Sequence, residues 1–192
     1  MIKLFLMIGS FVLFLSCSLE HKAIEKESYK ILSVLVNEFG IPRLPPPHPD
    51  KNVPYFTARQ IDSIKSKKQI IGIYPFFIND KIKKEDLNFI SDTSYFKLLD
   101  KFTLSKDISR LDVNSIKSKK EYKMVYIDST FSKYEQYHEY NKQLFFSKAL
   151  FNKDLDKAMI TVSLKNSGKF LCLLEKKEQK WKIKKTHMLL IF

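Results

Sequence analysis

The sequence has little arginine and little glycine, and each shortage excludes a class of function. Only three of its 34 basic residues are arginine, the side chain favoured for bidentate contacts to phosphates and base edges, and the lysines are spread along the whole chain. We therefore expect no nucleic-acid partner, although the formal net charge is +13. The four glycines lie too far apart to form a glycine-rich phosphate loop.

The usual patterns for metal binding and nucleophilic catalysis are also missing. The sequence contains no His-x-x-His or Cys-x-x-Cys pair, and no serine has glycine on both sides. We therefore expect no metal and no cofactor, and the sequence assigns no catalytic residue.

Residues 1–16 have the pattern of a secretory signal peptide. One positive charge, Lys3, precedes an apolar run from Leu4 to Leu15. The run is shorter than the roughly 20 apolar residues that a transmembrane helix needs, because the polar stretch Glu20-His21-Lys22 begins too soon. We expect this segment to be removed rather than to remain as a membrane span.

The end of this segment resembles the lipobox of bacterial lipoprotein precursors. Phe14-Leu15-Ser16-Cys17 places apolar residues and one small residue before a cysteine. The resemblance implies cleavage before Cys17, lipidation of its thiol with palmitate-like chains, and residence in the cell envelope. Ser18 favours the outer membrane over the inner one. The alternative is an ordinary secretory peptide with an incidental cysteine.

The rest of the chain predicts a single α+β domain at 23–192, joined to the lipid by a tether at 17–22. Cys172 is the only cysteine left and lies in an apolar stretch, so we expect a buried side chain rather than a reactive nucleophile. Six of the seven prolines fall in 41–54, which predicts an extended connection within the domain.

Three segments predict helices. Apolar residues share one face of an amphipathic helix from Ala23 to Phe39, with Glu25 and Glu27 near its start and Gly40 at its end. We expect this helix to cover a sheet, with the membrane surface as the alternative. A capping box at 57–60 and the three-residue spacing of apolar side chains at 92–102 predict two shorter helices.

The remaining apolar segments predict a mostly antiparallel sheet. An apolar run at 69–78 predicts a strand that Pro75 restricts to a sheet edge, and 122–127 predicts another strand. The last third predicts a four-stranded meander at 144–151, 157–164, 170–177 and 180–192, with turn residues such as Asn166-Ser167-Gly168 between strands. Trp181 and Ile183 alternate with lysines, which predicts one buried and one solvated face.

The meander resembles the C-terminal sheet of a family of uncharacterised secreted bacterial proteins. The similarity runs from Phe146-Ser147-Lys148 through Leu173-Leu174-Glu175 to Lys180-Trp181-Lys182-Ile183. The resemblance implies a secreted protein and transfers no activity. A helix against such a curved sheet also looks like the cone-shaped NTF2-like folds, a likeness that says little of function.

The densest cluster of polar and aromatic residues, at 131–140, supplies the candidate binding surface. Tyr134 and Tyr137 share a helical face, and His138 follows them. Because adjacent side chains diverge, His138 and Glu139 would not form a catalytic dyad. We expect a non-enzymatic binding or interaction module for an envelope protein or a small-molecule ligand. The alternatives are plain packing of this cluster, an envelope enzyme with a dispersed His and carboxylate site based on His138 or His187, and an immunity or inhibitor protein.

Overall fold

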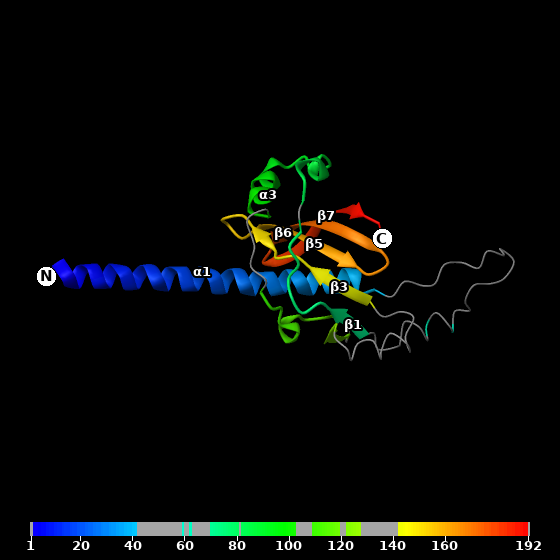
Figure 1. Cartoon of the computed structure of the whole chain (residues 1–192), viewed down its shortest axis with the longest axis horizontal. Helices are drawn as coiled ribbons and strands as arrows, with labels where there is room; N and C mark the ends of the chain where they lie inside the picture. The colour runs from blue at the N-terminus through cyan, green and yellow to red at the C-terminus, as the bar shows by residue number, and fades with distance from the viewer. Residues whose placement is uncertain are drawn as a thin grey trace.

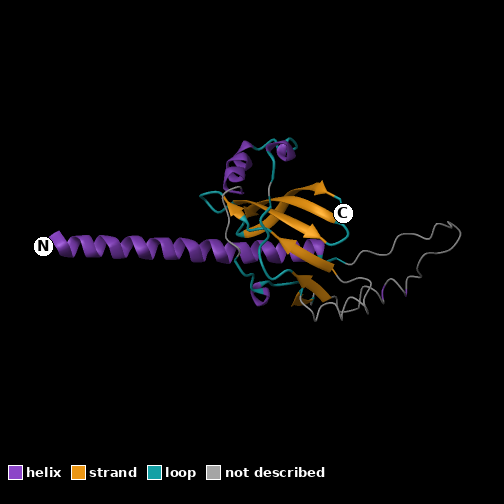
Figure 2. Cartoon of the chain, viewed as in Figure 1, coloured by secondary structure: helices purple, strands orange, loops and turns teal. Residues whose placement is uncertain are grey.

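The protein is an α+β fold with one long helix and several short helices around a mixed sheet (Figures 1 and 2). The computed structural model describes residues 2–41, 59, 62, 70–80, 82–102, 109–119, 122–127 and 142–191, with the side chains of the first helix described from His21 onward. The helical elements are α1 (Ile2–Phe39), η1 (Lys84–Leu87), η2 (Thr93–Tyr95), α3 (Phe96–Phe102) and η3 (Val113–Ser115). The strands are β1 (Ile70–Ile73), β2 (Lys123–Tyr126), β3 (Lys142–Phe146), β4 (Leu150–Phe151), β5 (Lys157–Leu164), β6 (Gly168–Lys177) and β7 (Lys180–Leu190).

The described strands form one sheet in the order β2-β1-β3-β5-β6-β7, with β4 paired to β5. β1 runs parallel to both β2 and β3, whereas β3, β5, β6 and β7 follow one another as antiparallel neighbours. The predicted α+β class is therefore confirmed, and the sheet is mixed, with two parallel pairings beside the antiparallel meander.

The prediction that Pro75 makes its strand an edge is wrong. β1 lies between β2 and β3, so it is an interior strand of the sheet. The strand ends at Ile73, before the proline, and the missing N–H of Pro75 therefore removes no hydrogen bond from it. The Pro75 carbonyl instead accepts the N–H of Leu111 at 2.9 Å, which ties two loops together beyond the strand.

The prediction of a single strand at 144–151 is also wrong, because the structure divides this segment between β3 and β4. Ser147 stands at the break, and its buried hydroxyl accepts the N–H of Thr161 at 2.9 Å. A serine hydroxyl here replaces a backbone acceptor, so the pairing with β5 is interrupted without leaving this donor unsatisfied.

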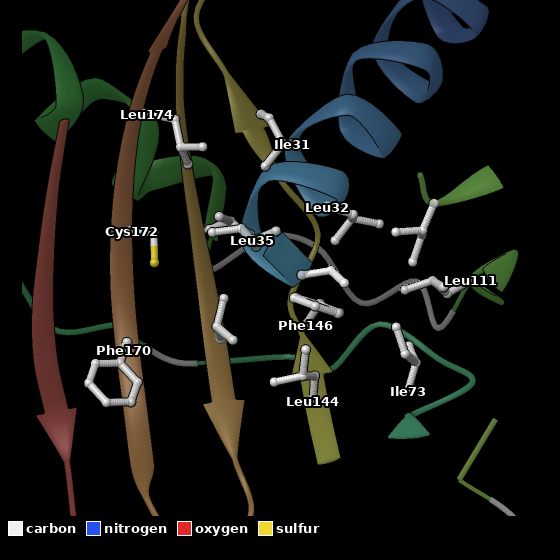
Figure 3. Packing of buried hydrophobic residues seen from close by; sticks show 14 of the residues in the cluster. Ile31, Leu32, Leu35, Ile73, Leu111, Leu144, Phe146, Phe170, Cys172 and Leu174 are labelled. Carbon is white, nitrogen blue, oxygen red and sulfur yellow. The ribbon is translucent and has the colours of Figure 1, made fainter. Parts of the chain in front are cut away.

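Helix α1 covers one face of the sheet (Figure 1). Ile31, Leu32 and Leu35 are fully buried and point from the helix into a core formed with residues of the strands (Figure 3). These strand and loop residues include Ile73, Leu111, Leu144, Phe146, Phe170, Cys172 and Leu174. Alternate residues of each strand reach this core because side chains along a strand point to opposite faces.

The helix begins far before the predicted start at Ala23. It is continuous from Ile2 to Phe39, so residues 17–22 are helical and the first half of α1 projects beyond the sheet (Figure 1). Glu25 and Glu27 therefore lie well inside the helix, and the prediction that they lie near its start is wrong.

The opposite face of the sheet is covered by η1, η2 and α3 (Figure 2). Tyr95, Leu98 and Leu87 pack there against Met159 and neighbouring strand residues. The helix predicted at 92–102 is confirmed as η2 followed by α3, with the carboxylate of Asp92 accepting the N–H of Ser94. The strand predicted at 122–127 is confirmed as β2.

Two other predictions fall mainly on residues outside the described ones. These are the proline-rich connection at 41–54, of which only Ile41 is described, and the capping box at 57–60, of which only Arg59 is described. In the described part of the chain, no helix has the length and hydrophobicity needed to cross a membrane.

Candidate functional site

Most of the residues singled out in the sequence lie outside the part of the chain that the structure describes. Tyr134, Tyr137 and His138 lie outside the described residues, so the binding surface there stays a prediction. Cys17 lies within α1, and its side chain is also outside the described set. The ring of His187 stacks on Phe89 with 4.1 Å between ring centroids.

A cavity of about 220 Å³ lies between α1, the segments that follow β1 and β3, and the segment that precedes η3. Helix residues spaced three and four apart form one wall, as expected for one face of an α-helix. The loop side is formed by residues that are distant in sequence. The lining residues are His21, Ile24, Glu25, Ser28, Tyr29, Phe77, Ser109, Arg110, Lys148 and Ala149.

Backbone hydrogen bonds hold the loop side of the cavity in place. The N–H of Phe77 donates to the carbonyl of Ser109 at 3.1 Å, and the N–H of Ile78 donates to the carbonyl of Phe146 at 2.8 Å. Because β1 and β3 are parallel, the segments after their carboxyl ends leave the sheet at the same edge. The parallel pairing therefore brings the segments of Phe77 and Lys148 together, and the antiparallel bridge between Phe76 and Arg110 adds Arg110 to the same cavity.

Three charged side chains line the cavity without pairing with one another. Among the described residues, Glu25, Arg110 and Lys148 make no ion pair within 4.0 Å. Arg110 is instead held over the ring of Tyr126, with 5.3 Å from its guanidinium carbon to the ring centroid. Within the described part of the chain, the cavity therefore offers two cationic groups and one carboxylate that are not joined in ion pairs.

Two hydroxyl groups of the cavity are engaged in hydrogen bonds within the protein. The hydroxyl of Ser28 donates to the carbonyl of Ile24 at 2.9 Å, and the hydroxyl of Tyr29 accepts the N–H of Asp112 at 2.8 Å. Burial raises the pKa of Tyr29, so this phenol stays protonated at neutral pH. Recognition of a ligand would thus depend mainly on the charged groups and on the apolar wall of Ile24, Phe77 and Ala149.

The histidines of the described structure are not hydrogen-bonded to a carboxylate at this cavity. His21 and Glu25 are one helical turn apart, yet no hydrogen bond joins them in the described structure, and His187 is not among the lining residues. The volume is below the roughly 300 Å³ at which pockets for drug-sized ligands begin. The cavity therefore fits a small polar molecule.

A second group of polar residues fixes α1 to the sheet. The carboxylate of Glu27 accepts hydrogen bonds from the indole N–H of Trp181 and the ammonium of Lys30, both at 2.6 Å, and lies 3.1 Å from the ammonium of Lys176. Burial by itself raises the pKa of Glu27, but these hydrogen bonds outweigh it and hold the pKa below its usual value. We interpret this network as structural, because its groups satisfy one another.

A third polar group lies within the opposite face of the sheet. The carboxylate of Asp80 accepts hydrogen bonds from the hydroxyl of Thr161 and the ammonium of Lys169. Ser163, on the same face of β5, has a buried hydroxyl with no hydrogen-bond partner in the described structure. Lys169 is held by Asp80, so it is not available as a base for this hydroxyl.

Replacing Ser163 with alanine should leave the protein as stable as before, or more stable by up to about 1 kcal/mol, since the change removes an unsatisfied buried hydroxyl. Urea unfolding followed by the fluorescence of Trp181 measures the effect. Thr161→Val is the matched control, because it removes a hydroxyl that does bond Asp80 and should destabilise. A clear loss of stability in Ser163→Ala would contradict this interpretation.

Sequence alone missed the cavity because its lining comes from four separate segments, and no local pattern connects them. Within the described residues, no three side chains of His, Cys, Asp or Glu gather as a metal site. Comparison of the chain with protein-family models, with curated proteins and with solved structures finds no match. The geometry of the cavity therefore carries the functional argument.

Proposed function

We propose that the protein is a lipid-anchored component of the bacterial cell envelope that binds a small polar ligand without transforming it. The observation that carries this proposal is the cavity beside α1, whose three charged residues have no ion pair in the described structure. Glu25 and Arg110 are exposed there, so both side chains are accessible to a ligand, and a ligand with matching groups can pair with them.

The lipid anchor is proposed from the lipobox-like end of the signal segment, with Cys17 as the acylated residue and the outer membrane favoured by Ser18. The position of the cavity supports a role next to the membrane. His21 follows Cys17 by about one helical turn, or roughly 6 Å along the axis of α1. A ligand in the cavity would thus lie close to the bilayer surface.

We also propose that the body has an NTF2-like cone. The feature that supports this finer assignment is the long helix packed across the antiparallel strands β3, β5, β6 and β7. A ligand site between helix and sheet would follow naturally from such a shape.

Substitution of Cys17 by serine tests the anchor. In cells fed radioactive palmitate, the wild-type chain should take up label and sediment with membranes, whereas Cys17→Ser should take up no label. Two buried acyl chains give stable attachment, so the change should be nearly complete rather than partial.

Cys172→Ala is the matched control because it removes the other cysteine of the chain. Cys172 is fully buried, and burial raises its pKa to about 12, so its thiol is unavailable for modification. This variant should keep both the label and the membrane location. Label on Cys17→Ser, or free wild-type protein in the medium, would refute the anchor.

A further inference from the structure

We propose that the cavity selects a small zwitterion in which an oxyanion and an ammonium group are separated by a few bonds, as in phosphoethanolamine. This inference rests on the proposed ligand-binding function and names its ligand class. The carrying observation is the separation of charge in the lining, with Arg110 and Lys148 on the loop side and Glu25 on the helix side.

The loop side is suited to a phosphate. The guanidinium of Arg110 presents a planar set of donors that matches oxyanions, and its place over Tyr126 restricts its movement. The hydroxyl of Tyr126 donates to the carbonyl of Leu111 at 3.0 Å, which fixes the ring itself. Lys148 adds a second positive charge from the segment after β3.

The helix side is suited to an ammonium group. Glu25 is exposed in the cavity wall and makes no ion pair in the described part of the chain. A simple anion would be attracted by the two cations but repelled by Glu25, and a simple cation would meet the reverse arrangement. A zwitterion satisfies both sides at once, and this difference gives selectivity.

The size and apolar surface of the cavity agree with this ligand class. A volume of about 220 Å³ admits only a short molecule, so its two charged ends can approach opposite walls together. The methylene groups between the two ends would contact Ile24, Phe77 and Ala149. The same chemistry occurs in a free zwitterion and in the headgroup of a phospholipid.

The test uses the full chain, both acylated in detergent and as Cys17→Ser, titrated with O-phosphoethanolamine, inorganic phosphate and ethanolamine. Calorimetry gives the affinities, and phosphorus NMR reports the bound phosphate. We expect O-phosphoethanolamine to bind about tenfold more tightly than phosphate, the gain expected from one added charge pair in a partly enclosed site. Ethanolamine should bind most weakly, because it meets the two cations.

Two variants separate the two halves of the site. Lys148→Gln should lower the affinity for both phosphate-bearing probes by about tenfold. Glu25→Gln should lower the affinity for O-phosphoethanolamine to that for phosphate, and should leave the affinity for phosphate unchanged or higher. Lys153→Gln and Glu85→Gln are matched controls, since both residues are exposed and neither lines the cavity. Neither control should change any affinity.

Vesicles identify the source of the zwitterion. If phosphatidylethanolamine vesicles displace O-phosphoethanolamine from the Cys17→Ser chain, the ligand is a lipid headgroup, and if they do not, it is a free zwitterion. If phosphate and O-phosphoethanolamine bind equally well and Glu25→Gln has no effect, the proposal that the ligand is a zwitterion is overturned. A site for anions that depends on Lys148 would then remain, and the proposed binding function with it. Absence of binding by all probes also overturns it. The palmitate experiment decides the anchor independently of these results.

Discussion

Replacing Glu27 with alanine should lower the free energy of unfolding by about 3 kcal/mol, because it leaves the buried indole N–H of Trp181 without an acceptor and Lys176 without its carboxylate. Glu27 is the polar link between α1 and the edge of the sheet formed by β6 and β7. Trp181 is the only tryptophan of the chain, so its fluorescence reports directly on this contact during urea unfolding.

Glu38→Ala is the matched control for this prediction. Glu38 lies on the same helix but is exposed, and its removal should change stability by no more than about 0.5 kcal/mol. If Glu27→Ala unfolds at the same urea concentration as Glu38→Ala, the network does not hold α1 to the sheet.

The same network predicts how stability depends on pH. The pKa of Glu27 is lower in the folded protein than its ordinary value of 4.5, so its contribution is fully present above that value and is lost as pH falls through the folded pKa. Glu27→Gln lacks this contribution at every pH, so the gap in stability between wild type and variant should shrink as pH falls below the ordinary value of 4.5 and close once pH is below the folded pKa. Hydrogen bonds from Ser94, Lys157 and Lys184 hold the pKa of Asp92 low as well, so both proteins should still lose stability in acid.

The sheet could be predicted largely because its strands carry clear alternation. Trp181 is buried and the neighbouring Lys180 and Lys182 are exposed, so the face of β7 that meets α1 can be recognised in the sequence. The position of β1 could not be predicted, because the apolar run continues through Pro75 whereas the strand ends at Ile73. No local pattern gives the end of a strand to within two residues.

The polar sites are harder to predict than the sheet because each joins distant segments. Glu27 and Trp181 are 154 residues apart, and in the sequence Glu27 has the pattern of a charge near a helix start. Arg110 is a single arginine in a loop, with no motif around it. Its place at the cavity follows from the bridge to Phe76 in the segment after β1, because the parallel pairing of β1 with β3 sets that segment beside the one that carries Lys148.

Replacing Gly168 with alanine should destabilise the protein by about 2 to 3 kcal/mol, because the backbone there has a conformation that is costly for residues with a side chain. Gly168 opens β6 with a φ of +134°. A Cβ atom at this position would also lie 2.4 Å from the carbonyl oxygen of Leu190 on β7. The substitution therefore strains the turn and clashes with the neighbouring strand.

The neighbouring Ser167→Ala is the matched control, since Ser167 lies in the same turn and its N–H still donates to the carbonyl of Leu164. It should leave the urea midpoint almost unchanged. The clash in Gly168→Ala has one route of relief, because Leu190 is half exposed and can move away from β6. Hydrogen exchange separates the cost of the clash from the cost of the strained backbone. Faster exchange confined to residues 188–190 would report that β7 moves away from β6. The loss of global stability that remains would then measure the backbone strain at Gly168. If Gly168→Ala has the stability and the hydrogen exchange of the wild type, then β6 and β7 do not pair in the register that sets Lys169 opposite Leu190.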